Sequence, residues 1–161
     1  MKHFSLFAIL CSLFIFLSGC AKQDKPEGLP ELLPYELILT QDGKPLPGAN
    51  VSLTAQPPGQ WIVGGGTDDN GVAKIYTHGK FAGAPAGKYK VVITKTVTEG
   101  GPTEADKNNP SYNGGSGKIF SLVDKQFGDV KTTPLEVDVK AGENKATLDA
   151  GKAVKIAMPQ M

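Results

Sequence analysis

The sequence contains no arginine, and it has few cysteines, tryptophans and histidines. All 17 basic residues among the 161 are lysines, and 16 Asp and Glu residues oppose them, so the formal net charge is only +1. The absence of arginine excludes bidentate guanidinium recognition of phosphate or carboxylate groups. Because there is no basic excess, nucleic acid is not expected as a partner. The composition, 40% hydrophobic and 20% charged, is typical of one globular domain.

Both cysteines fall within the first 20 residues, so the rest of the chain has no thiol. This excludes a disulfide, a Cys-ligated metal and a cysteine nucleophile from the folded domain. Before Cys20, a lysine near the N-terminus is followed by an apolar run from Phe4 to Leu17. As a helix this run would reach only ~21 Å, too short for a bilayer core of ~30 Å. It therefore indicates the apolar region of a secretion signal.

Leu17-Ser18-Gly19-Cys20 resembles a bacterial lipobox, in which small residues precede the cleavage site and the cysteine thiol accepts a diacylglyceryl group. We predict a signal peptide at 1–19, a palmitate-type lipid on Cys20 and a tether at 20–34. Acyl chains contribute ~0.8 kcal/mol per buried CH₂, so two or three of them anchor a protein stably. The predicted location is the bacterial cell envelope, at the outer membrane in a Gram-negative cell, on its periplasmic or surface face. The alternative is an ordinary cleaved signal followed by an incidental cysteine.

From residue 35 to residue 158 the pattern is that of a single all-β domain. Short stretches of alternating apolar and polar residues are separated by Gly, Pro, Asn and Asp turns. Seven or eight strands in about 125 residues is the spacing of a two-sheet Greek-key β-sandwich, of transthyretin-like or Ig-like type. The expected strands are 35–40, 49–55, 61–67, 72–77, 88–97, 134–140, 145–149 and 153–157.

The connections between these strands have equally clear signals. Asp68–Gly71 predicts a tight hairpin turn between 61–67 and 72–77, because Asx side chains cap turns and Asn-Gly tolerates positive φ. A turn at 142–144 predicts that 145–149 pairs back onto 134–140. The glycines at 64–66 indicate a strand distortion.

Two segments are expected to depart from the sandwich pattern. Residues 98–118 have almost nothing to bury and predict a long mobile loop. Residues 119–127 predict a short helix of one or two turns. Within the tether, Leu32 and Leu33 are expected to pack onto the domain edge.

Four segments carry a family resemblance. They are Asp42–Val51 (DGKPLPGANV), Thr67–Gly71 (TDDNG), Ala84–Val91 (APAGKYKV) and Val123–Leu135, which contains VDKQFG and TTPL. In this order they resemble carboxypeptidase regulatory-like domains of the transthyretin-like (prealbumin-like) superfamily, as found in small bacterial lipoproteins. The resemblance implies a seven-stranded Greek-key sandwich, and it gives the motif residues turn and core roles rather than an activity. In the fourth segment, Asp124 and Phe127 replace the family's usual proline and tyrosine.

No residue constellation points to catalysis. The enzymes of this superfamily, the hydroxyisourate hydrolases, use histidines, an arginine and a C-terminal Tyr-Arg-Gly-Ser-type ending, whereas this chain has only His78 after the signal peptide and ends in Met-Pro-Gln-Met. No GxSxG, HExxH or P-loop motif occurs. His78 lies in a polar turn and is expected to be exposed. Asp68–Gly71 offers oxygen ligands for Ca²⁺ but lacks the rest of an EF-hand loop, so turn chemistry accounts for it. No enzymatic activity, cofactor or metal is expected.

Two aromatic residues are candidates for ligand contact. Trp61 is either a surface platform for a sugar ring or a buried residue at a sheet edge. Tyr112, among Asn, Ser and Gly in the 98–118 loop, is either an adaptable contact or flexible filler. The sequence therefore predicts a non-enzymatic, lipid-anchored envelope domain with a structural, adhesion or protein-interaction role, which contacts an envelope protein through strand edges or the long loop. The alternative is an accessory module that binds a carbohydrate or a peptide.

Overall fold

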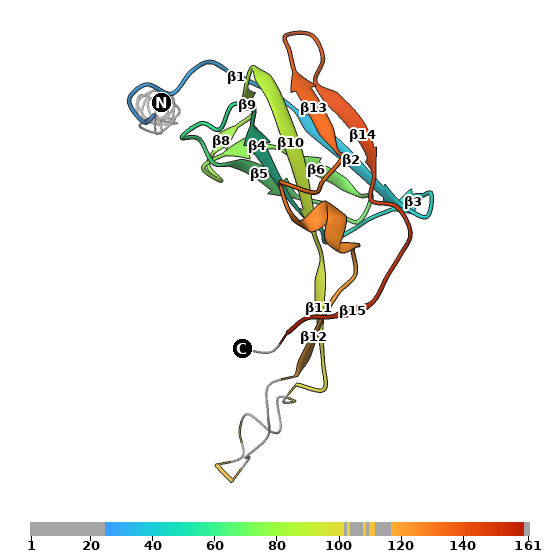
Figure 1. Cartoon of the computed structure of the whole chain (residues 1–161). Helices are drawn as coiled ribbons and strands as arrows, with labels where there is room; N and C mark the ends of the chain where they lie inside the picture. The colour runs from blue at the N-terminus through green and yellow to red at the C-terminus, as the bar shows by residue number, and fades with distance from the viewer. Residues whose placement is uncertain (1–24, 102, 104–107, 109, 112–116, 160–161) are drawn as a thin grey trace, which may run out of the picture.

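A computed structural model describes residues 25–101, 103, 108, 110–111 and 117–159 (Figure 1). These residues form an all-β sandwich, as predicted, with fifteen short strands and one 3₁₀ helix. The strands are β1 Leu32–Leu33, β2 Glu36–Gln41, β3 Lys44–Pro45, β4 Asn50–Ala55, β5 Val63–Gly66, β6 Val72–Lys74, β7 Tyr76–Thr77, β8 Phe81–Ala82, β9 Ala84–Pro85, β10 Gly87–Thr94, β11 Thr96–Glu99, β12 Lys118–Ser121, β13 Glu136–Val139, β14 Lys145–Asp149 and β15 Ile156–Ala157; the helix is η1, Lys125–Gly128.

The larger sheet has the strand order β13-β10-β4-β5-β7-β8, and all its pairs are antiparallel. Its two longest strands show the predicted alternation. Val51 and Leu53 of β4 are buried, with the exposed Ser52 between them. Tyr89, Val91 and Ile93 of β10 are buried on the same side of the sheet. Because side chains alternate along a strand, one face of the sheet is apolar and covers the core.

The second sheet has the order β14-β2-β3, with β6 also pairing with β2. Here one prediction is wrong. Residues 145–149 do not pair back onto 134–140: β14 lies parallel to β2, with Lys145 opposite Glu36 and Asp149 opposite Thr40. The turn at 142–144 therefore carries the chain from the edge of the larger sheet to the edge of the second sheet.

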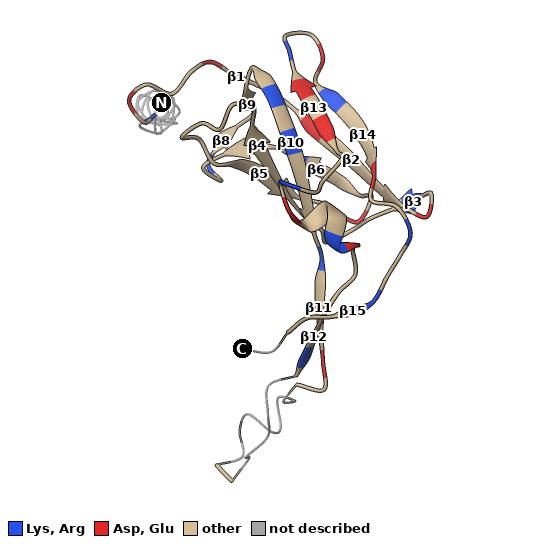
Figure 2. Ribbon diagram, in the orientation of Figure 1, with Lys and Arg blue, Asp and Glu red and all other residues tan. Residues whose placement is uncertain are grey.

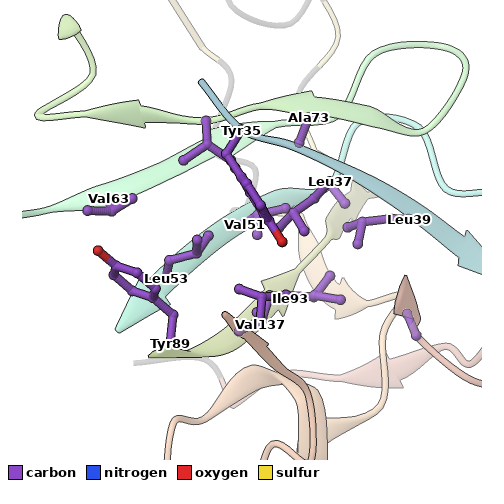
Figure 3. Packing of buried hydrophobic residues seen from close by; sticks show 14 of the residues in the cluster. Tyr35, Leu37, Leu39, Val51, Leu53, Val63, Ala73, Tyr89, Ile93 and Val137 are labelled. Atoms are coloured by element: carbon purple, nitrogen blue, oxygen red, sulfur yellow. The ribbon is translucent and has the colours of Figure 1, made fainter. Parts of the chain in front are cut away.

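The core lies between the two sheets. Figure 3 shows Leu37 and Leu39 of β2 on one side, and Leu53 and Ile93 of the larger sheet on the other. Leu37 and Leu39 are fully buried. Burying such a side chain contributes roughly 1.5–3 kcal/mol, so this packed layer is what stabilises a domain without disulfides.

The predicted strand 72–77 is split between the two sheets. β6 pairs with β2 of the second sheet, whereas β7 pairs with β5 of the larger one, and the buried Ile75 lies between them. The glycines of β5 make this crossing possible. A Cβ atom on Gly64 would collide with the carbonyl oxygen of Val51, and one on Gly65 with that of Lys74. These glycines therefore mark a close approach of backbones within a regular strand, rather than the predicted distortion.

Thr67 and the turn after it join two of the sequence motifs. The buried Thr67 hydroxyl donates to the carbonyl oxygen of Leu46 (2.7 Å) and accepts from the backbone N–H of Ala49 (2.8 Å). The next residue caps the predicted tight turn, because the Asp68 carboxylate accepts from the N–H groups of Asn70 and Val72. The motif residues here hold turns together, as the resemblance implies.

A three-stranded sheet, β11-β12-β15, projects from one end of the sandwich as an arm (Figure 1). It corrects three predictions. The predicted strand 88–97 ends at Thr94, and β11 continues in the arm. Residues 98–99 and 118, expected within the long loop, are strand residues of β11 and β12. The expected helix over 119–127 is a strand at its start and a single 3₁₀ turn, η1, at its end.

The N-terminal segment reaches the opposite end of the sandwich. Leu32 and Leu33 form β1, which pairs with β9, and Leu33 packs against the core, as predicted. The predicted signal peptide and Cys20 lie outside the described residues. Among the described residues, no helix is long and apolar enough to cross a membrane.

Candidate functional site

An apolar groove of about 250 Å³ lies where the arm leaves the sandwich. Three segments build it: the end of β10 with the start of β11, the chain from Ser121 through η1, and the C-terminal residues 156–159. Its main apolar side chains are Ile93, Val123, Ile156, Ala157 and Met158. Since pockets for whole small molecules usually span about 300–1,000 Å³, this groove has room for one or two side chains of a larger partner.

The C-terminal residues form one wall of the groove as a strap held by side chains. The Gln41 amide donates to the carbonyl oxygen of Lys152 (3.4 Å), and the Asp42 carboxylate accepts from the N–H of Ala153 (3.0 Å). Further along, the Lys155 ammonium pairs with Glu99 at 2.7 Å and lies over the Phe120 ring. The strap is therefore fixed to both the sandwich and the arm.

The carboxylates at the groove rim serve the backbone. Asp124 caps η1 by accepting from the N–H of Gln126 (3.0 Å), and Asp129 accepts from the N–H of Lys131 (2.8 Å). The helix η1 is held in place by packing, because its Phe127 side chain is buried in the core. The shape of the groove thus depends on the hydrogen bonds by which Asp124 and Asp129 cap their turns. A ligand would contact mainly the apolar wall of the groove.

The arm also presents strand edges beside the groove. β11 and β15 are the outer strands of its sheet, and no backbone pairing to their outer sides occurs in the part of the chain that the structure describes. Most residues of β11 and β12 are exposed, and Ile119 exposes 39% of its surface. Unpaired N–H and C=O groups next to an apolar groove are what an extended peptide needs for strand addition.

Trp61 is neither a fully exposed surface platform nor a fully buried residue, the two alternatives that the sequence leaves open. It is half-buried and packs against the core, and its ring meets the His78 ring edge-on, with centroids 5.5 Å apart and planes at 77°. Its neighbour Ile62 is 71% exposed. His78 is exposed in a turn at φ 53°, as predicted. Trp61 is therefore partly exposed, next to the exposed Ile62.

None of the other candidate residues from the sequence is among the described residues that line the groove. Cys20 and Tyr112 lie outside the described residues. Asp68 acts as a turn cap, and no group of three or more His, Cys, Asp or Glu side chains that could hold a metal ion occurs among the described residues. The sequence does not indicate the groove, because one wall is the strap at residues 151–159, whose position is set by tertiary contacts alone.

Comparison with family models, with curated proteins and with solved structures finds no match to this chain. The resemblance to carboxypeptidase regulatory-like domains therefore depends on the four sequence motifs alone.

Proposed function

We propose that this chain is a non-enzymatic, lipid-anchored interaction module of the bacterial cell envelope, which binds an extended segment of an envelope protein at the arm. The observation that carries the proposal is the apolar groove between β10, η1 and the C-terminal strap, with the open strand edges of the arm next to it. An extended peptide would add main-chain hydrogen bonds at an edge and place a side chain in the groove.

Two further features support this role. The groove lies at the end of the sandwich opposite to β1, so an anchor on Cys20 would leave the arm pointing away from the membrane (Figure 1). The acidic side chains at the rim are already engaged as backbone caps, which fits a binding surface better than a catalytic one. Adhesion and scaffolding both require a surface presented in this way.

Site-specific photocrosslinking in the native envelope tests the binding surface. A photoreactive residue at Met158, 43% exposed on the groove wall, should give a discrete adduct with a protein, whereas one at the exposed Thr147 of β14 should not. Filling the groove with Thr94→Trp should abolish the adduct, and Thr147→Trp is the matched control. An adduct that survives Thr94→Trp, or equal labelling from both positions, would contradict the proposal. A glycan adduct would favour the carbohydrate-binding alternative.

The anchor is tested separately by the mass of the N-terminal peptide. Processing at the lipobox should leave Cys20 as the first residue with two or three acyl chains, and Cys20→Ser should release the protein from the membrane fraction. An unmodified cysteine in a membrane-free protein would refute the anchor without touching the groove.

A further inference from the structure

Two loops of the larger sheet meet at the end of the sandwich where the N-terminal segment enters. The loop at 56–62 joins β4 to β5, and the segment 78–88 runs from the end of β7 into β10. They are tied together by hydrogen bonds from the N–H of His78 to the carbonyl of Ile62 (2.7 Å) and from the N–H of Gln56 to the carbonyl of Lys88 (2.9 Å). Since β9 in the second segment pairs with β1, this segment lies directly beside the end of the tether.

This end of the sandwich carries an exposed apolar tip with rigid backing. Ile62, at 71%, is the most exposed large hydrophobic side chain among the described residues. Trp61, beside it, packs against the core and makes an edge-to-face contact with the His78 ring. The neighbouring Pro57 and Pro58 are also exposed. A partly exposed indole, which is amphipathic, is the side chain typically found at a membrane–water interface.

The two segments that form this tip carry only basic charges, and acidic residues lie on the elements next to them. Segments 56–62 and 78–88 contain Lys80 and Lys88, both exposed, and no acidic residue (Figure 2). The acidic side chains of this end belong to neighbouring elements. Asp138 of β13 lies opposite Lys88 and pairs with Lys140 at 3.0 Å, while Glu31 and Glu143 lie in the N-terminal segment and in the connection between β13 and β14. Lysines around an apolar tip are the arrangement that favours an anionic lipid surface, because each lysine near the headgroups adds electrostatic attraction.

The tether is short enough to keep the tip near a bilayer. Cys20 is five residues before Lys25 and twelve before Leu32, where pairing begins. At ~3.4 Å per residue these lengths span at most about 17 Å and 41 Å. A surface that is weak by itself becomes occupied when a short linker makes its binding intramolecular.

We propose that the tip formed by Trp61 and Ile62, with Lys80 and Lys88, rests in the headgroup region of the membrane that carries the lipid on Cys20. The inference depends on the proposed anchor and adds an orientation to it. The tip makes a second contact with the bilayer, so the domain stands with β8 and β9 towards the lipid and its arm outward.

The test uses Trp61, the only tryptophan of the chain, as its own probe. The full lipidated protein is reconstituted in phosphatidylcholine–phosphatidylglycerol vesicles with or without bromine atoms on the acyl chains, and flotation of the same vesicles reports the anchor. We expect about a twofold loss of Trp61 emission in the brominated vesicles, because an interfacial indole lies within reach of the upper acyl chain. Ile62→Ser should reduce this loss, whereas Ile119→Ser, an exposed isoleucine on the arm, should leave it unchanged.

Each outcome decides the inference. Protein that floats while Trp61 emission ignores the bromine would overturn the membrane contact and leave the anchor standing. Protein that does not float would overturn the anchor and this inference with it. Floating protein whose Trp61 emission shifts with soluble oligosaccharides, but not with brominated lipid, would show a sugar platform instead.

Discussion

Thr67 is the residue on which two separate turns depend. Replacing it by the isosteric valine removes the hydroxyl that pairs with Leu46 and Ala49 and leaves both backbone groups buried without that partner. We expect Thr67→Val to lower the free energy of unfolding by about 2 kcal/mol, since unsatisfied buried groups cost about 1–3 kcal/mol each. The matched control is Thr147→Val on the exposed face of β14. Urea unfolding followed by Trp61 fluorescence measures both, and equal midpoints would contradict this role of Thr67.

Two buried tyrosines give the domain an alkaline limit. Burial raises the pKa of Tyr35 above its ordinary value of 10.0, with Glu143 and Asp138 adding to the effect, and burial alone raises the pKa of Tyr89. In the unfolded chain both phenols ionise near pH 10, whereas folding holds them neutral. Their contribution to stability is therefore complete below pH 10 and is lost as the pH rises above it.

Phenylalanine variants isolate this alkaline effect from lysine titration. Tyr35→Phe should flatten the fall in unfolding free energy between pH 9 and pH 11, because it removes one ionisable group from the unfolded state. Tyr89→Phe should do the same but cost about 1 kcal/mol at pH 7, since the Tyr89 hydroxyl donates to the carbonyl of Pro85 at 2.8 Å. Urea titrations across this pH range check both, and an unchanged pH slope in the double variant would show that other groups set the limit.

At the scale of elements, the glycines of β5 are expected to be needed where the chain passes from β6 in the second sheet to β7 in the larger sheet. A Cβ at Gly65 would meet the carbonyl of Lys74, a backbone atom that cannot move without disturbing β6. We expect Gly65→Ala to destabilise the domain by about 2 kcal/mol or more, by the overpacking mechanism. Gly128→Ala is the control, because a Cβ there meets nothing within 4 Å. Thermal unfolding compares them, and a Gly65→Ala midpoint as high as that of Gly128→Ala would refute the close approach.

The same elements show what a sequence can and cannot specify. β4 and β10 were predictable because each buries one face, and alternation reveals that directly. Alternation says nothing about which strand lies next, so the partner of β14 was assigned wrongly. The split at Ile75 and the groove at Met158 depend on segments distant in sequence. The sequence does not decide whether Trp61 is buried or exposed, because its half-burial depends on the packing of the loop rather than on the local pattern.

At the scale of the whole molecule, the last twenty residues divide into two parts with different tasks. A chain that ends at Gly151 loses the strap and the groove wall but keeps β14 beside β2. A chain that ends at Ala141 loses β14 and exposes the edge of β2, which carries Leu37 and Leu39. We expect the first variant to retain a cooperative urea transition and the second to lose it, because sheet closure stabilises the core. Cooperative unfolding of the chain ending at Ala141 would disprove the requirement for β14.

The parallel pair β2–β14 also has a consequence in time. The two strands that complete the second sheet are far apart in sequence: the hydroxyl of Thr40 on β2 donates to the carbonyl of Leu148 on β14, 108 residues away. Pairings of such long sequence separation form late, after the loop between them has been closed. If the chain crosses a membrane from its N-terminus, as proposed for this protein, β2 would emerge well before β14, the strand that pairs with it in parallel. Under that proposal, the second sheet could close only after β14 had crossed, so the chain would remain unfolded enough to pass through the export channel until then.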